Sequence, residues 1–572
     1  MTDAPSPRPA PSRVVVWGAG AALVMLLATL GPALLSGLPA GDRTVDAMGS
    51  WWFQWWVGTA LRAGSPLDHT DLLFFPWGKD ILRDTGANLV DAGLAGLLQG
   101  ILPPSQAWNL LYLLILGGNF TACLLLGGSS WTGRLGAGLV GMLHPYVLWE
   151  LQEGRPTQAM LGPAIAAFAL SSSAFSAKDP RAALRCAALA GALLGLAGWV
   201  YWYAALFAAL AIGLLGLQAR AVGRLALVAG VAAGVAAPLA WPLLQALHAG
   251  ALTGLLPVSA WLDGSTSLQN LAGDRLQLCV LGGPCTASFL AETGLRPIGT
   301  ALGWLSWPLA AAAGLAGRRF WLVGLLAIAL ALGPFPGGLP NPIYLGLSAL
   351  LPPLARLYWP CRALLLLVPL AALGAAALLR RIGPARSGQG LGLLLALLAV
   401  DAAATGRWPL PTWEPAVEAA WACLPPSSGG VISLPYGVGH DLLMAQTVHG
   451  NPLLGGMNER SRAQAPAAQQ ALRTENAWLA AVLRATVDPR DHGAGTEAEK
   501  AAVGALGFRW VVVRWASAPA VRSRANRAAV ERRLGLLLGA PALRGEALSI
   551  YAPWGGEALA CPADMDLEGP GR

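Results

Sequence analysis

The sequence predicts an α-helical polytopic membrane protein that ends in a soluble α/β domain. Of its 572 residues, 55% are hydrophobic and only 12% are charged, which is too apolar for a soluble protein. The apolar residues form long runs, and a run of about 20 residues is enough to cross a bilayer. After residue 405 these runs stop and ordinary polar content begins. We therefore expect a transmembrane domain over residues 1–405 and a soluble domain over residues 406–572.

About eleven apolar runs are long enough to be membrane spans. The first run is longer than the apolar core of a signal peptide and has no small-residue cleavage site, so we expect it to be a span. We divide residues 186–217 into two spans, because the aromatic break at 199–203 would place amphipathic rings at an interface. The expected spans are 14–38, 107–128, 134–150, 159–176, 186–201, 203–218, 225–249, 298–317, 320–335, 362–379 and 389–405.

Positive charges between the runs indicate the orientation. In the eleven-span arrangement the basic clusters fall on one side, which the positive-inside rule assigns to the cytoplasm. They are Arg8, Arg13, Arg134, Lys178, Arg181, Arg185, Arg220, Arg224, Arg318, Arg319, Arg380, Arg381 and Arg386. In a bacterial inner membrane the other side is the periplasm, which receives the loop at 41–106 and the C-terminus. These clusters account for the net charge of +8, so we expect no nucleic-acid partner.

The large first external loop, residues 41–106, combines carboxylates with tryptophans. Asp42 and Asp46 are four residues apart and would share one face of a helix. The pairs Trp51-Trp52 and Trp55-Trp56 have the same spacing. This pattern is typical of an amphipathic helix at the membrane interface, and a platform that stacks sugars is the alternative.

Other charged side chains stand at the external ends of spans. They are Glu150, Glu153 and Arg155 at one turn, and Arg356, Tyr358 and Arg362 before a late span. The positive-inside rule disfavours external arginines, and a phosphate ligand would explain them. Charges at membrane boundaries can also be stop signals or snorkelling anchors.

The C-terminal domain shows short β-branched runs separated by a helical stretch. Strands are predicted at 430–434, 510–513 and 548–551, and helix within 462–484. Cysteines allow two bridges in an oxidising compartment. These are Cys279 with Cys285, which flank a five-residue external segment, and Cys423 with Cys561.

Several common catalytic motifs are missing from the sequence. It contains no Walker loop, dinucleotide-binding fingerprint, nucleophile elbow or zinc-type spacing of His and Cys. This argues against ATP-driven transport and against the common soluble hydrolases.

The order of many short pieces resembles bacterial GT-C-type membrane proteins, which are similar to mannosyltransferases that use lipid-linked sugars. The pieces are Gly41-Asp42, Gly64-Ser65-Pro66, Phe74-Phe75-Pro76-Trp77-Gly78, Asn109-Leu110-Leu111, His144-Pro145-Tyr146, Gly154-Arg155, Tyr358-Trp359-Pro360-Cys361-Arg362, Ile432-Ser433-Leu434-Pro435, Gln446 to Leu453, Gly455-Gly456 and Leu506 to Val513. They extend over nearly the whole chain.

The resemblance implies an inverting sugar transfer at the periplasmic face. A carboxylate of the first external loop is then the general base or a metal ligand, and Asp42 matches that position better than Asp46. The sequence departs from the family in lacking a clear Asp-Asp or Glu-x-Asp pair, which argues against metal dependence, and a divalent cation is kept only as an option. A polyprenyl phosphate remains in the bilayer, so its phosphate must be met at interface depth, where Arg356 and Arg362 could bind it.

We therefore expect a glycosyltransferase that moves a sugar from a polyprenyl-phosphate donor to an envelope glycan or lipid acceptor. The alternative is a non-catalytic membrane protein that binds or exports lipid-linked glycans. Secondary transport is less favoured, because the span number is odd and no repeated pair of Gly- or Pro-broken spans can be aligned.

Overall fold

The computed structural model describes residues 13–81, 88–248, 302–334, 339–351, 354, 360–383, 386–405, 408–437, 440–456, 465–490, 493–518, 524–555 and 558–562. The chain forms two compact units. The first, here called the helical unit, comprises Met1–Asp42, Ala87–Leu94 and Ile101–Trp413. The second, the mixed unit, comprises Arg43–Gly86, Ala95–Gly100 and Glu414–Arg572. Most of the loop at 41–106, which the sequence attaches to the transmembrane domain, lies in the mixed unit.

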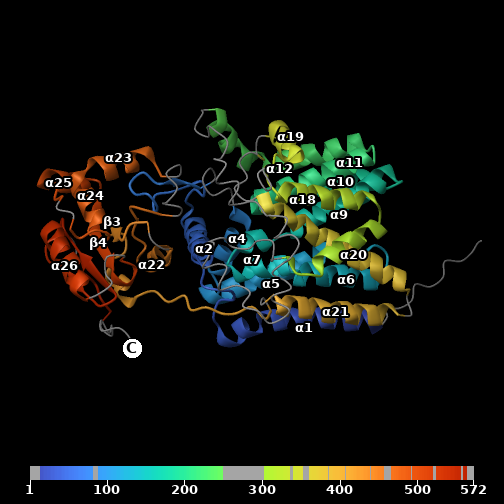
Figure 1. Cartoon of the computed structure of the whole chain (residues 1–572), viewed down its shortest axis with the longest axis horizontal. Helices are drawn as coiled ribbons and strands as arrows, with labels where there is room; N and C mark the ends of the chain where they lie inside the picture. Colours follow the sequence, from blue (N-terminus) through green and yellow to red (C-terminus); the bar gives the residue numbers. More distant parts are fainter. Residues whose placement is uncertain are drawn as a thin grey trace, which may run out of the picture. The chain divides into compact units, whose positions relative to one another are not determined.

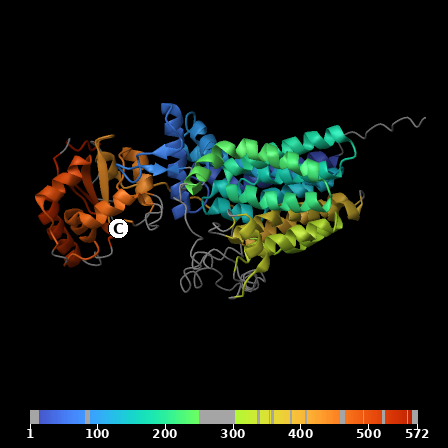
Figure 2. The same ribbon diagram turned by 90° about the horizontal axis from the view of Figure 1, so that it is seen from above.

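The described part of the helical unit consists mainly of helices (Figure 1). Its α-helices are α1 (Arg13–Ser36), α5 (Pro104–Leu124), α6 (Trp131–Leu143), α7 (Pro145–Gln152), α8 (Pro156–Ala159), α9 (Gly162–Ser176), α10 (Pro180–Val200), α11 (Trp202–Gln218), α12 (Val222–His248), α17 (Ser306–Ala312), α18 (Arg319–Ala331), α19 (Pro342–Leu350), α20 (Leu367–Ile382) and α21 (Ser387–Ala404). Helix α4 (Leu89–Leu98) begins in this unit and ends in the other. The teal and green helices α9 to α12 run side by side in Figures 1 and 2.

Within the described ranges, six helices are long and apolar enough to cross a membrane, so the chain is a multi-pass membrane protein. They are Pro104–Gly127, Pro156–Ser176, Pro180–Val200, Val222–Pro242, Pro360–Ile382 and Ser387–Ala404. The predicted division of residues 186–217 is confirmed, because α10 ends at Val200 and α11 begins at Trp202. The predicted span at 134–150 is instead broken after Leu143. Pro145 cannot donate a backbone hydrogen bond to continue α6, and His144 Nδ1 accepts from Tyr146 N at 3.2 Å to start α7.

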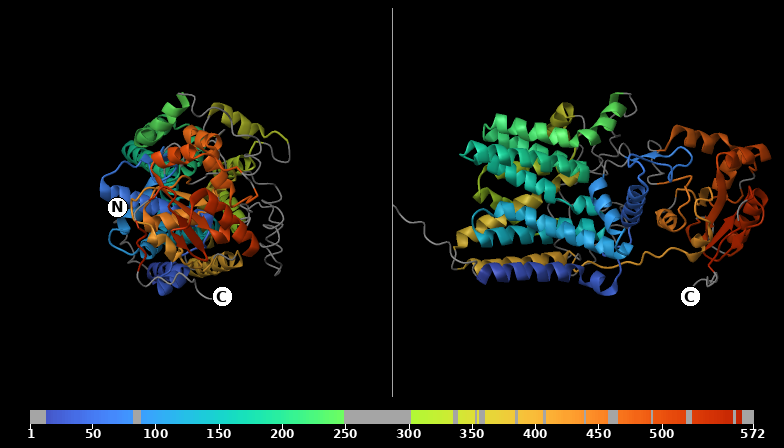
Figure 3. Two further views of the ribbon diagram at one scale, coloured as in Figure 1. Left: turned by 90° about the vertical axis from the view of Figure 1, so that its left-hand side faces the viewer. Right: turned by 180° about the vertical axis from the view of Figure 1, so that it is seen from behind.

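The segment that follows α21 returns to the first helix of the unit. Trp408 Nε1 donates to Thr29 Oγ1 at 3.0 Å, and Leu410 N donates to Thr29 O at 3.0 Å. Helices α1 and α21 both pack against α6 and run along the same side of the unit (Figure 3). Gly41 N donates to Pro411 O at 2.8 Å. The segment that follows α1 therefore lies beside the segment that follows α21.

The mixed unit contains a four-stranded sheet of order β3-β4-β6-β5. Strand β3 (Gly430–Leu434) is parallel to β4 (Phe508–Arg514), while β6 (Leu548–Tyr551) is antiparallel to both β4 and β5 (Leu543–Arg544). The three longer strands lie where the β-branched runs predicted them. The described α-helices of this unit are α2 (Val45–Ala63), α22 (Asp441–His449), α23 (Ala467–Glu475), α24 (Ala477–Arg484), α25 (Glu497–Ala505) and α26 (Arg524–Leu538).

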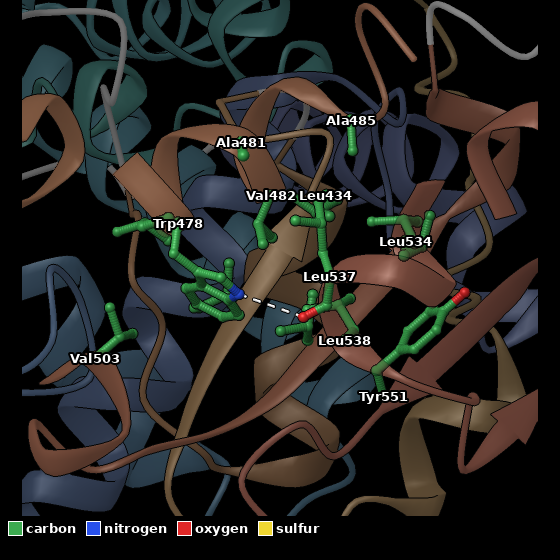
Figure 4. Packing of buried hydrophobic residues seen from close by; sticks show 14 of the residues in the cluster. Leu434, Trp478, Ala481, Val482, Ala485, Val503, Leu534, Leu537, Leu538 and Tyr551 are labelled. Carbon is green, nitrogen blue, oxygen red and sulfur yellow. Dashed lines mark hydrogen bonds between the residues drawn. The ribbon is translucent and has the colours of Figure 1, made fainter. Parts of the chain in front are cut away.

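Apolar side chains from the sheet and its helices form one core in this unit (Figure 4). Trp478 of α24 is 2% exposed, and its Nε1 donates to Leu537 O at 3.3 Å, so the indole N–H is satisfied inside the core.

One of the two predicted disulfide bonds is present. Cys423 and Cys561 form a disulfide bond with a Cα–Cα distance of 4.1 Å. The other proposed pair, Cys279 and Cys285, lies outside the described residues.

The tryptophan-rich helix α2 (Val45–Ala63) packs inside the mixed unit, so its prediction as a membrane-interface helix is wrong. Trp52 is fully buried, and its Nε1 donates to Gln446 Oε1 of α22 at 2.6 Å. Trp51 and Trp56 are 7% and 5% exposed, so their rings are covered by protein. The spacing of four residues identified the buried face correctly but could not tell whether lipid or protein covers it.

Helix α2 also corrects the predicted relation of the two aspartates. Thr44 caps the helix by accepting from Ala47 N at 3.0 Å, so the helix begins at Val45. Asp46 lies in its first turn, whereas Asp42 precedes the cap in extended chain and belongs to the helical unit. The two carboxylates therefore do not share a helical face.

Candidate functional site

The candidate site lies in the helical unit around α7, α8 and the turn between them. The carbonyl groups at the end of α7 anchor the chain that leaves α1. Asp42 N donates to Gln152 O at 2.6 Å, and Tyr112 OH donates to Leu151 O at 2.7 Å. A Cβ atom on Gly41 would lie 2.9 Å from Gln152 O, and its φ of +109° also favours glycine. Glycine at position 41 therefore lets the backbone lie against the end of α7, and this contact positions the carboxylate of Asp42.

The Asp42 side chain is half-buried and is oriented by α7. Gln152 Nε2 donates to Asp42 Oδ2 at 2.8 Å. An amide partner orients the carboxylate through a hydrogen bond, and the second oxygen is left for a base or ligand role. The structure thus brings Asp42 to the turn that carries Glu150, Glu153 and Arg155.

Glu150 is fully buried and forms an ion pair inside the helical unit. Its Oε2 lies 2.7 Å from Arg155 Nε, and Arg155 Nη2 lies 3.8 Å from Glu153 Oε2. The Arg155 guanidinium also lies 4.4 Å from the centre of the Trp149 ring. Glu150 is therefore not a snorkelling anchor, because such a residue keeps its charged end in water.

Arg362 approaches the same charges from the short 3₁₀ helix Pro360–Leu366. Its side chain is 6% exposed, and Nη1 donates to the hydroxyl of Tyr201 at 2.5 Å. Tyr201 is the residue at which α10 and α11 separate. Among the described residues no carboxylate lies within 4.0 Å of the Arg362 guanidinium, although it is close enough to Glu150 for their charges to interact. Its predicted companions Arg356 and Tyr358 lie outside the described residues.

Sequence reasoning missed Asp91, a third carboxylate that contacts the α7–α8 region. Asp91 lies in the first turn of α4, is 3% exposed, and accepts a hydrogen bond from Thr157 Oγ1 of α8 at 2.6 Å. Burial raises the pKa of its carboxyl group to about 7, and the hydrogen bond from Thr157 opposes this rise. An acidic residue within an apolar helical run is a signal that could have identified it.

Asp46 is not part of this group of residues. It is half-buried near the start of α2 in the mixed unit. In the ranges that the structure describes, no three His, Cys, Asp or Glu side chains are grouped so that they could hold a metal ion. Asp42 and the Gln152 amide supply only one carboxylate, which is too few ligands for a metal site.

No family model matches the sequence, and no curated protein matches it. The fold, however, is similar to solved structures. The arabinofuranosyltransferase AftD from Mycobacteria has a TM-score of 0.54 and 19% identity, over 95% of this chain and 40% of AftD. A second AftD structure, the mutant R1389S, has a TM-score of 0.56. This chain thus spans less than half the length of AftD.

A weaker similarity is to ArnT from Cupriavidus metallidurans bound to undecaprenyl phosphate, with a TM-score of 0.47 and 13% identity over 98% of this chain and 100% of ArnT. This second score is too low to support an argument. The similarity to AftD shows the fold alone at this level of identity. It confirms that the chain has a polytopic helical membrane fold, as the sequence predicted, and that this fold is similar to that of AftD.

Proposed function

We propose that this protein is a membrane glycosyltransferase that moves a sugar from a polyprenyl-phosphate donor to an envelope glycan or lipid acceptor at the periplasmic face. The fold supports glycosyl transfer as the general class. The observation that carries the proposal is Arg362, a buried guanidinium whose described hydrogen-bond partner is a neutral tyrosine. A buried charge needs a counter-ion, and a phosphate matches the geometry of a guanidinium.

In the proposed reaction, Asp42 and Arg362 have separate roles. Asp42 accepts the proton of the acceptor hydroxyl group as its oxygen forms a bond to the anomeric carbon of the sugar. The bond from that carbon to the phosphate oxygen breaks, and the electron pair leaves with the polyprenyl phosphate. Arg362 stabilises the negative charge that develops there. Glu150, Glu153 and Arg155 line the same region and are proposed to position the substrates.

The function is tested by incubating the purified full-length protein in nanodiscs with a panel of labelled polyprenyl-phosphate sugars. The acceptor is an envelope extract from a strain that lacks the gene. We expect label in a glycan or glycolipid that the deletion strain lacks and the parent strain contains. Binding of the donor without transfer would favour the non-catalytic alternative, and neither binding nor transfer would overturn the proposal.

The proposed location of the reaction requires the C-terminus to be periplasmic and the N-terminus cytoplasmic. A C-terminal alkaline phosphatase fusion should therefore be active, and a C-terminal green fluorescent fusion should be dark. Fusions placed after Arg220, between α11 and α12, are the matched control and should give the opposite pattern, because Arg220 belongs to a predicted cytoplasmic cluster. The reverse result at the C-terminus would refute the predicted topology.

A further inference from the structure

Buried polar atoms without hydrogen-bond partners gather around α7 and α8. In native interiors about nine of ten buried polar atoms have a hydrogen-bond partner, so a local group of unpaired atoms marks a place where a polar ligand can bind. Within the described part of the helical unit these atoms include Asp91 Oδ1, Asn119 Oδ1, Tyr146 OH and Gln158 Oε1. Asn119 itself donates to Ala159 O at the end of α8 at 2.8 Å. Three of these four atoms are acceptors, and acceptors need a ligand that carries donors.

Among these atoms, the unpaired oxygen of Asp91 has the largest desolvation cost, because it belongs to a carboxyl group. Thr157 donates to Oδ2, while Oδ1 is buried and accepts no hydrogen bond from a described side chain. The backbone N–H groups of Asp91 and Ala92 lower the pKa of the carboxyl group but do not reach Oδ1 with hydrogen-bond geometry. No Lys, Arg or His of the described ranges lies within 4.0 Å of its carboxyl group. A side chain with a purely structural role would normally have both oxygens satisfied, because an unpaired buried carboxylate is costly.

The chemistry of Asp91 selects the kind of ligand. A carboxyl group repels a phosphate, so the phosphate of the donor is excluded, and an apolar lipid chain has no hydrogen-bond donor. A sugar hydroxyl group supplies the missing donor. Because burial brings the pKa of Asp91 to about 7, the carboxyl group can also donate to a hydroxyl oxygen at neutral pH.

We propose that Asp91, oriented by Thr157, binds one hydroxyl group of the transferred sugar through its free Oδ1 atom. The proposal rests on the proposed function and adds a residue that discriminates between sugars. A hydrogen bond to a charged group contributes about 10- to 100-fold in affinity, and a site built around a substrate hydroxyl group rejects an analogue that lacks it.

The test compares a donor with its monodeoxy analogues, each lacking one hydroxyl group, in the full-length parent protein and in Asp91→Ala. For the parent we expect one analogue to lose about 10- to 100-fold in kcat/KM. In Asp91→Ala the loss in kcat/KM for that analogue, relative to the complete donor, should fall to a few-fold. The losses for the other analogues should stay as they are in the parent. Asp91→Asn, which retains an acceptor oxygen, should give an intermediate result and serves if the alanine variant does not fold.

Asp179→Asn is the matched control, since Asp179 accepts from Arg181 N at 3.0 Å and Ala182 N at 3.3 Å as the cap of α10. It should leave the loss in kcat/KM for each analogue unchanged.

If Asp91→Ala lowers kcat/KM for every analogue by the same factor, Asp91 has a structural role and the proposal is overturned. If the parent binds donors without transfer, the proposed function fails, and the same comparison on Kd decides the role of Asp91. A donor that neither binds nor reacts overturns both.

Discussion

Replacing Asp42 with asparagine should lower the rate of sugar transfer by about 10²- to 10⁴-fold, which corresponds to about 3–5 kcal/mol of barrier. A carboxamide has nearly the same shape as a carboxylate but cannot accept the proton of the acceptor hydroxyl group. Its oxygen can still accept from Gln152 Nε2, which lies 2.8 Å from Asp42 Oδ2, so the local structure should persist. The measurement is single-turnover transfer in nanodiscs, with the melting temperature recorded for each variant.

Asp46→Asn is the matched control, because Asp46 is a nearby aspartate that lies in the other unit of the chain. We expect it to reduce transfer much less than Asp42→Asn does. If folded Asp42→Asn transfers sugar at the parental rate, Asp42 is not the base, and the interpretation of this loop as an active site fails.

Replacing Arg362 with glutamine should weaken binding of the polyprenyl-phosphate donor by about 2–5 kcal/mol, or roughly 30- to several-thousand-fold in Kd. The guanidinium is buried, and in the described residues its hydrogen bond goes to the neutral hydroxyl of Tyr201. Without donor, the Arg362 guanidinium interacts with Glu150 only beyond 4.0 Å, so its removal should change the melting temperature little. Titration of the nanodisc-bound protein with sugar-free polyprenyl phosphate measures the change in Kd.

A second arginine of the helical unit provides the comparison. Arg224 Nη1 donates to Ala174 O at 2.6 Å and to Ala177 O at 3.1 Å, so its contacts are structural. Arg224→Gln should lower the melting temperature and leave donor affinity near the parental value. Should Arg362→Gln lose stability while donor affinity does not change, Arg362 would have the same structural role as Arg224.

Local features of the fold could be predicted from the sequence, because they depend on residues close together in the chain. The aromatic break at Tyr201 marked the end of α10, and the β-branched runs marked the strands β3, β4 and β6. The apolar runs and the basic clusters between them identified a multi-pass membrane protein. These signals arise from hydrophobic periodicity and backbone sterics, which act over one or two turns.

Several features of the candidate site were also foreseen, although their environment was not. The sequence places Asp42, Glu150, Arg155 and Arg362 at the external ends of spans, and membrane topology leaves Asp42 and Arg362 unexplained. That reasoning could not show that Arg155 pairs with Glu150 or that Arg362 faces Tyr201, which is 161 residues away. The neutral partner, rather than the charge alone, is what makes Arg362 a candidate for phosphate.

The sequence by itself determined that this protein is an apolar multi-helix chain with a separate α/β region, since composition and periodicity are local properties. Only the tertiary structure decided which surfaces cover one another. Trp52 meets Gln446, 394 residues away, so the tryptophan helix is buried by protein. Asp91 meets Thr157 across 66 residues, which leaves one carboxyl oxygen buried without a partner. The physical reason is that amphipathic periodicity reports that a face is buried, whereas the identity of its partner depends on packing between distant segments.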